Sequence, residues 1–151
     1  MNLINEAIIA QHLKVEMAGN DKPGIIHELL DVLDRAGAIA DRKAAEQAVF
    51  DREKCMSTGL EAGIAIPHGK TDTVDRLIVA VGLKPEGVDF DSGDGQPSRI
   101  FILTLSPASR SGPHIRFMAE ISRLLQDSQV REKLLAAQTP EQMAVILKGA
   151  K

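Results

Sequence analysis

Two apolar runs in the middle of the chain constrain its fold more than any other feature. Residues 77–81 read Leu-Ile-Val-Ala-Val, and residues 100–105 read Ile-Phe-Ile-Leu-Thr-Leu, interrupted only by Thr104. A strand formed from either run presents apolar side chains on both faces, because successive side chains point to opposite sides of a sheet. Such strands belong in a sheet that is covered on both faces, which requires a three-layer arrangement.

Helical patterns flank these runs and can supply the cover. Asp21 and Asp41 are suited to cap two helices in the first third of the chain, and Gly37 is a plausible end for the earlier one. Further helices are predicted to begin near residues 113, 128 and 140, and shorter strands are expected at 13–17, 64–66 and 88–90. The fold class we expect is an α/β/α sandwich with a mixed sheet, formed by residues 1–151 as a single domain.

Composition excludes several classes of function. The net charge of -3 argues against a nucleic-acid binder, which would carry a basic stripe. No apolar stretch approaches the roughly 18 residues of a membrane span, and no secretory signal is apparent. Cys55 is the single cysteine, which rules out an internal disulfide and suits the reducing cytoplasm; we expect it to be buried. Metal-type spacings such as CxxC are absent, so neither metal nor cofactor is expected.

The segment from Gly63 to Lys70, Gly-Ile-Ala-Ile-Pro-His-Gly-Lys, is the clearest candidate for a functional motif. Pro67 fixes its own backbone, and Gly69 is expected to let the chain turn sharply beside the ring. His68 would then be presented at the end of a strand with little bulk around it. From the pattern alone, an ordinary histidine in a turn is the alternative interpretation.

Two more polar residues lie on apolar helical stripes. His114 precedes Phe117 and Met118 on one such stripe, in the first helical turn, where backbone N–H groups favour an anion. The same field should keep its imidazole neutral. Arg52 continues the stripe of the helix that Asp41 caps, near the helix end. The alternatives are a backbone-bonded histidine and an arginine that extends into solvent.

These groups suit phosphoryl chemistry. A neutral imidazole such as that of His68 has a free lone pair and can act as a nucleophile near neutral pH. Arg52 and a helix N-terminus can stabilise the charge on phosphoryl oxygens during transfer, and the scheme requires no metal.

Taken together, the motifs resemble a known family. Arg52-Glu53, Ser57-Thr58-Gly59 and the Ala-Ile-Pro-His-Gly segment ending at Gly69 are similar to the fructose/mannitol-type enzyme IIA of the bacterial phosphotransferase system. The nitrogen-regulatory enzyme IIA proteins belong to the same family. Gly87-Val88-Asp89-Phe90 and the later His114 continue the resemblance in order, over nearly the whole chain.

The resemblance implies roles for individual residues. His68 would accept a phosphoryl group on Nε2 from a histidine phosphocarrier protein, and a IIB component would receive it. His114 matches the family's second histidine and Arg52 its active-site arginine. Thr58 falls in the Ser-Thr-Gly motif and could bond near the phosphate, with a turn-stabilising hydroxyl as the alternative.

Two functions remain open at this point. One is a phosphate carrier for sugar transport, and the other is a regulatory protein whose phosphorylation at His68 controls partners such as ion transporters or kinases. A domain that keeps the fold without accepting phosphate is a third reading, which the joint presence of His68, His114 and Arg52 disfavours. The sugar, the partner and the oligomeric state are not predicted by the sequence.

Overall fold

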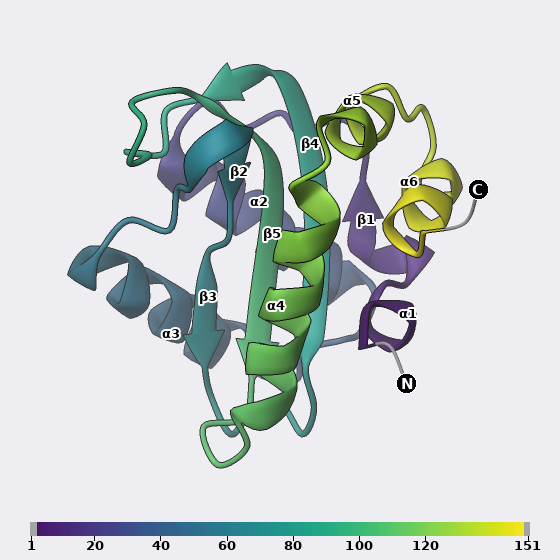
Figure 1. Ribbon diagram of the computed structural model, residues 1–151. Coiled ribbons are helices and arrows are strands. Elements are labelled where there is room, and N and C mark those ends of the chain that lie inside the picture. The colour runs from purple at the N-terminus through teal and green to yellow at the C-terminus, as the bar shows by residue number, and fades with distance from the viewer. Residues whose placement is uncertain (1–2, 150–151) are drawn as a thin grey trace.

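The computed structural model describes residues 3–149 and contains a mixed five-stranded sheet covered by helices (Figure 1). The strands are β1 (Leu13–Lys14), β2 (Ile64–Ala65), β3 (His68–Lys70), β4 (Ile78–Val88) and β5 (Ser98–Ser106). The helices are α1 (Leu3–Ala7), α2 (Lys22–Arg35), α3 (Arg42–Cys55), α4 (Gly112–Leu125), α5 (Ser128–Leu135) and α6 (Pro140–Leu147). Short 3-10 turns occupy Ala10–His12 and Glu61–Gly63.

The sheet has its two long strands at the centre and short strands at the edges. β4 and β5 pair antiparallel, β1 lies parallel to β4, and both β2 and β3 lie parallel to β5. Ile64 is in register with Ile100 and His68 with Thr104, so β2 and β3 are two pieces of one edge interrupted at residues 66 and 67. The predicted position of His68 at the end of a strand is therefore corrected: His68 begins β3.

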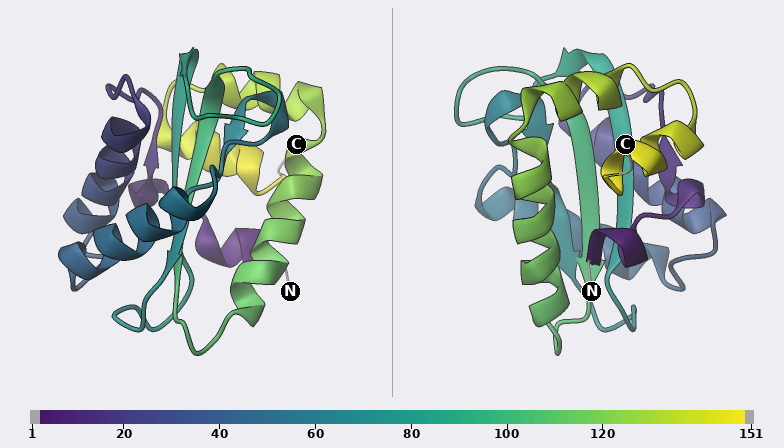
Figure 2. Two further views of the ribbon diagram at one scale, coloured as in Figure 1. Left: turned by 90° about the vertical axis from the view of Figure 1, so that its left-hand side faces the viewer. Right: turned by 45° about the vertical axis from the view of Figure 1, so that its right-hand side comes forward.

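Side chains on the central strands alternate between two cores, as the apolar runs predict. Ala80 belongs to the core beneath α2 and α3, whereas Val79 and Val81 belong to the core beneath α1, α4, α5 and α6. The edge-on view in Figure 2 shows α2 and α3 on one side of the sheet and α4 on the other. The predicted three-layer α/β/α sandwich with a mixed sheet is confirmed.

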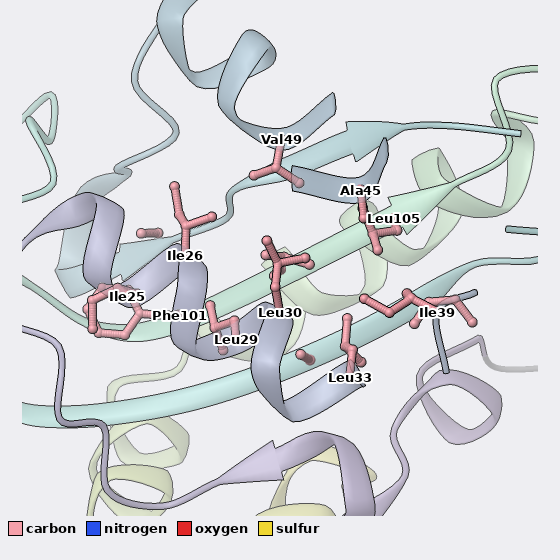
Figure 3. Close-up of a cluster of buried hydrophobic side chains, with 14 of the residues drawn as sticks. Ile25, Ile26, Leu29, Leu30, Leu33, Ile39, Ala45, Val49, Phe101 and Leu105 are labelled. Carbon is pink, nitrogen blue, oxygen red and sulfur yellow. The ribbon is translucent and has the colours of Figure 1, made fainter. Parts of the chain in front are cut away.

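Each face is closed by helix stripes that are mainly apolar. Figure 3 shows the core on the α2 and α3 face, where Leu29, Leu30 and Val49 belong to one cluster with Phe101 of β5. On the other face, Phe117 and other residues of α4 pack against the opposite side of the sheet. The buried area makes the sheet a rigid base for side chains at its edge.

Helix starts follow the predicted capping chemistry. The carboxylate of Asp21 accepts a hydrogen bond from the Gly24 N–H at 2.8 Å, and that of Asp41 accepts one from Ala44 at 3.0 Å. The hydroxyl of Thr139 does the same for α6. Each cap contributes about 1 kcal/mol.

Three local expectations differ from the structure. The strand expected at 13–17 is limited to β1, and the expected strand at 88–90 is instead the end of β4, which has an irregularity between Leu83 and Val88. Cys55 is exposed at the end of α3 and not buried, because the helix ends there and its last turn projects beyond the sheet. Within residues 3–149, no helix combines the length and apolar character that crossing a membrane requires.

Candidate functional site

The two candidate histidines meet at one edge of the sheet. His68 comes from β3 and His114 from the first turn of α4, and their ring centroids lie 5.2 Å apart with the planes tilted by 35°. His68 is half-buried and His114 is buried. The structure thus brings together two imidazoles that are separated in the sequence by the strands β4 and β5 and their connecting loops.

The ring of His68 is oriented by a hydrogen bond to the backbone two residues earlier in the chain. Its Nδ1 lies 2.9 Å from the carbonyl oxygen of Ile66. A carbonyl only accepts hydrogen bonds, so Nδ1 carries the proton in the neutral ring. Nε2 is then left with its lone pair, which is the atom required of a nucleophile.

Gly69 has a different role from the one predicted. It lies within β3, and a Cβ built on it would approach the backbone of Ala48 and Val49 in α3 to 2.8 Å. A side chain at this position would push the strand away from the helix. Gly69 therefore allows β3 to pack closely on α3, which fixes the position of the neighbouring His68. It does not form a sharp turn.

His114 is held as a neutral group. Burial, followed by the nearby charges of His68 and Lys70, lowers the pKa of its imidazole to about 4. Its Nδ1 lies 3.3 Å from the hydroxyl of Thr104, in a buried contact. The prediction of a neutral His114 is consistent with this environment, although burial is the main cause.

Thr104 is a residue of the site that motif reasoning missed. It lies directly opposite His68 in the β3–β5 register and contacts His114 through its hydroxyl. The signal was present in the sequence, since Thr104 is the only polar residue in the run 100–105. Its hydroxyl can donate to Nδ1 of His114, which leaves the Nε2–H of that ring free to donate elsewhere.

The start of α4 adds an electrostatic contribution. Ser111 occupies the N-cap without a side-chain hydrogen bond to the helix, and Pro113 lies in the first turn. The unpaired backbone N–H groups and the helix dipole favour negative charge beside His114.

Arg52 lies at the C-terminal end of α3, where it is half-buried. It follows Ala48 and Val49, the residues that contact Gly69, by one helical turn, which places it on the side of α3 next to β3. Its guanidinium donates to the carbonyl of Met56 at 3.1 Å. In the described part of the chain it makes no hydrogen bond to either imidazole.

Thr58 is buried and bonded to Glu53 through both of its donors. The backbone N–H donates to Oε2 at 2.9 Å and the hydroxyl donates to Oε1 at 2.6 Å. Its carbonyl accepts the N–H of Ile66 at 3.0 Å. These bonds favour a role in holding the loop, and a direct contact of Thr58 with phosphate stays a prediction.

A hollow lies between the segment ahead of β2 and the C-terminal half of α4, and it reaches Ile66, two residues before His68. It has a volume of about 670 Å³ and is lined by Leu60, Ile66, Ile121 and Leu125, among others. Leu60, which lines this hollow, and Ile115, in the first turn of α4, expose large apolar side chains to solvent. Among residues 3–149, no three His, Cys, Asp or Glu side chains gather so that they could hold a metal ion.

Comparison with known proteins assigns the family. Residues 7–150 match the family described as "Phosphoenolpyruvate-dependent sugar phosphotransferase system, EIIA 2". A Haloferax volcanii protein named "PTS system fructose-specific EIIA component" is 40% identical over 126 residues, which cover 83% of this chain and 82% of that protein. The chain belongs to the type 2 EIIA family of this phosphotransferase system.

Other relatives are larger proteins or regulatory ones. The "PTS system fructose-specific EIIABC component" of Bacillus subtilis is 33% identical over 144 residues, which cover 95% of this chain but only 23% of that protein. The crystal structure of "Nitrogen Regulatory Protein IIA-Ntr" from Neisseria meningitidis has a TM-score of 0.88 at 29% identity, covering 97% of this chain and 99% of that one. The "complex of enzyme IIAMTL and phosphorylated enzyme IIBMTL" from Escherichia coli has a TM-score of 0.79 at 26% identity, covering 93% of this chain and 96% of that one.

Proposed function

We propose that this chain is a phosphohistidine carrier of the phosphoenolpyruvate-dependent phosphotransferase system. Nε2 of His68 accepts a phosphoryl group from a histidine phosphocarrier protein and passes it to a IIB component, in the cytoplasm and with residues 1–151 acting as one EIIA domain. The observation that carries the proposal is the pairing of His68 with a neutral, buried His114, with Nδ1 of His68 bonded to the Ile66 carbonyl.

The transfer step balances without a metal or cofactor. The Nε2 lone pair of His68 attacks phosphorus, the N–P bond of the donor phosphohistidine breaks, and its electron pair returns to the donor nitrogen. The Nδ1 proton of His68 stays in place. Positive charge then develops on the His68 ring, and the carbonyl of Ile66 stabilises that charge through the existing hydrogen bond. In the onward transfer His68 is the donor: the IIB nucleophile attacks phosphorus, the N–P bond at Nε2 breaks, and its electron pair returns to Nε2.

Three groups are suited to stabilise the phosphoryl oxygens. His114 donates from Nε2 while Thr104 holds its Nδ1, and the free N–H groups at the start of α4 add partial positive charge. Arg52 supplies a full positive charge from the side of α3. Of these groups His114 is buried, and a donor withdrawn from water is worth more than one in bulk solvent.

Partner proteins are expected to dock over the apolar hollow. A phosphoryl group moves between proteins only when both histidine-bearing surfaces come together, which favours an apolar contact area with a polar rim. The exposed Leu60 lines this hollow, and the exposed Ile115 follows His114 directly in the chain, so both suit such a contact. For the mannitol protein of Escherichia coli, a complex with phosphorylated IIB is named directly.

The proposal is tested by intact-protein mass spectrometry after incubation with phosphoenolpyruvate, enzyme I and the phosphocarrier protein. Alkaline quenching preserves phosphohistidine. The expected result is one phosphate on the wild type, none on His68→Ala, and slower labelling of His114→Ala. A folded wild type that stays unlabelled, beside a labelled EIIA control protein, would refute the carrier function.

A regulatory function is the second candidate, favoured by the likeness to the IIA-Ntr structure over almost the full length of both chains. In that case the charge on phosphorylated His68 makes or breaks a complex with a regulated protein. Transfer assays with a purified IIB component separate the two: a carrier loses its phosphate to IIB within the assay, whereas a regulator keeps it. Deletion of a carrier would also stop uptake of its sugar.

A further inference from the structure

We infer that Glu53 is a positioning residue for His68, acting through Thr58 and Ile66, with Lys22 holding Glu53 in place. We name the four residues Glu53, Thr58, Ile66 and His68 the Glu53 relay. The inference deepens the proposed function and rests on it, because the orientation of the His68 ring matters for transfer only if that ring accepts phosphate.

The relay begins at a buried carboxylate. Glu53 lies next to Arg52 on α3, yet its side chain is only 6% exposed and turns toward the loop that follows the helix. Both of its oxygens accept hydrogen bonds from Thr58, one from the backbone N–H and one from the hydroxyl. A fork of this kind fixes the residue in position and direction, as a single hydrogen bond would not.

The next links run along the backbone. The carbonyl of Thr58 accepts the N–H of Ile66 at 3.0 Å, and the carbonyl of Ile66 accepts the Nδ1–H of His68 at 2.9 Å. Gly59 forms a bridge with Ala65 beside this contact, so the loop pairs with the chain just ahead of His68 like a short strand. A displacement of Thr58 therefore moves the carbonyl that selects the protonated nitrogen of His68.

Lys22 places a positive charge beside the buried carboxyl group of Glu53. Its Nζ lies 2.8 Å from Oε2 of Glu53 and 3.1 Å from a carboxylate oxygen of Asp91, and its charge lies 5.1 Å from the ring centroid of Phe90. Burial works to lower the pKa of Lys22, but the bonds and charges of Glu53 and Asp91 outweigh it and leave the pKa above its ordinary value. Glu53 is almost fully withdrawn from solvent, so the geometry of its contact with Lys22 is narrowly defined.

The pair also ties together segments far apart in the sequence. Lys22 starts α2, Glu53 is near the end of α3, and Asp91 follows β4. Ser57 reaches the same cluster, because its hydroxyl donates to the Phe90 carbonyl and lies near Lys22. The relay thus anchors the loop ahead of His68 to three elements of the domain.

The test compares Thr58→Val, Glu53→Gln and a matched control. Thr58→Val keeps the shape of the side chain and removes only the hydroxyl that bonds Glu53. Thr58→Ser, by contrast, retains this hydroxyl. Glu46→Gln is the control, because Glu46 is an ion-paired glutamate on the same helix that contacts Arg42 and His27 and not the relay. Glu53→Gln removes the charge, and its folding is checked by denaturation.

The first readout is the tautomer of His68 in the unphosphorylated protein, measured by long-range ¹H–¹⁵N NMR. We expect a protonated Nδ1 in the wild type, Glu46→Gln and Thr58→Ser, and a mixture of tautomers in Thr58→Val and Glu53→Gln. The second readout is phosphoryl acceptance, where both relay variants should be slower by about 10-fold at saturating donor, with an unchanged KM for the donor.

Wild-type tautomers in folded Thr58→Val and Glu53→Gln would overturn the relay, whatever the transfer rates. If Glu53→Gln does not fold, Thr58→Val alone decides by the same criterion. A wild type that shows the expected tautomer but never accepts phosphate would instead refute the proposed function and leave the structural relay standing. The two failures are therefore distinguishable.

Discussion

The hydroxyl of Thr104 lies 3.3 Å from Nδ1 of His114, a contact between the C-terminal part of β5 and the first turn of α4. It occupies a position where the apolar pattern of β5 would otherwise continue, and it holds the ring that faces His68. Through this contact Thr104, a polar residue in a buried strand, becomes part of the site.

Thr104→Val is expected to slow phosphoryl acceptance by about 10-fold, because Nδ1 of His114 loses its partner and the ring no longer keeps Nε2–H for donation. The free energy of unfolding should change by only about 1 kcal/mol, since valine has nearly the same shape. The rate of phosphoryl acceptance is measured in quenched transfer assays, and the free energy of unfolding by urea denaturation. An unchanged rate would show that the hydroxyl does not orient His114.

His114→Gln is expected to slow acceptance more strongly than Thr104→Val, roughly 10²-fold, because it removes the imidazole N–H donor from the phosphoryl group. His68 should still become labelled. The measurement is the labelling rate followed by intact mass, with the ring-retaining Thr104→Val as the comparison. Equal rates for His114→Gln and the wild type would remove His114 from the transfer step.

Stability should fall as the pH drops from about 6.5 to about 4. In this window the unfolded chain binds a proton at His114 that the folded protein does not, because the folded pKa is about 4 against an ordinary 6.5. More protons on the unfolded state mean lower folded stability at lower pH, amounting to roughly 3 kcal/mol across the window. Urea denaturation at several pH values gives the free energy of unfolding as a function of pH. This free energy should change less steeply with pH in His114→Gln than in the wild type. The same pH dependence in both proteins would contradict the burial of an uncharged ring.

Gly69→Ala is expected to destabilise the fold by about 1–3 kcal/mol and to slow acceptance, because its Cβ would meet the backbone of α3 at 2.8 Å and lift β3. Gly93→Ala is the matched control, since a Cβ there meets nothing within 4 Å. Thermal denaturation of both variants gives the comparison. Equal melting temperatures of Gly69→Ala and Gly93→Ala would indicate that β3 can move away from α3 without loss of stability.

Arg52→Gln is expected to reduce the rate of acceptance by roughly 10²-fold, and Arg52→Lys should recover part of it, since the charge returns without the planar fork. Loss of the bond to the Met56 carbonyl should cost the helix end less than about 1 kcal/mol. Transfer rates measured on all three proteins separate charge from geometry. A wild-type rate in Arg52→Gln would show that Arg52 takes no part in transfer and serves only the hydrogen bond at the helix end.

Much of the fold could be predicted because it depends on local patterns. The two-sided apolar runs required a covered sheet, and Asp21 and Asp41 begin their helices where capping chemistry places them. The inward position of His114 followed from its spacing to Phe117. The end of β4 was less predictable, since a bulge lets a strand continue where turn residues suggest a break.

The site was only partly predictable, because its remaining features depend on tertiary contacts. Nothing local indicates that Glu53 is buried, and its partner Lys22 lies on another helix. Gly69 looked like a turn residue, and only the approach of α3 explains it. The part played by Thr104 required the register between β3 and β5.

The central claim is that Nε2 of His68 carries the phosphate, and it is tested most directly by ¹⁵N and ³¹P NMR of the phosphorylated protein with ¹⁵N-labelled histidine. The account predicts phosphorus–nitrogen coupling at Nε2 of His68, with a proton retained on Nδ1. Coupling at Nδ1 of His68, or at His114, would contradict it.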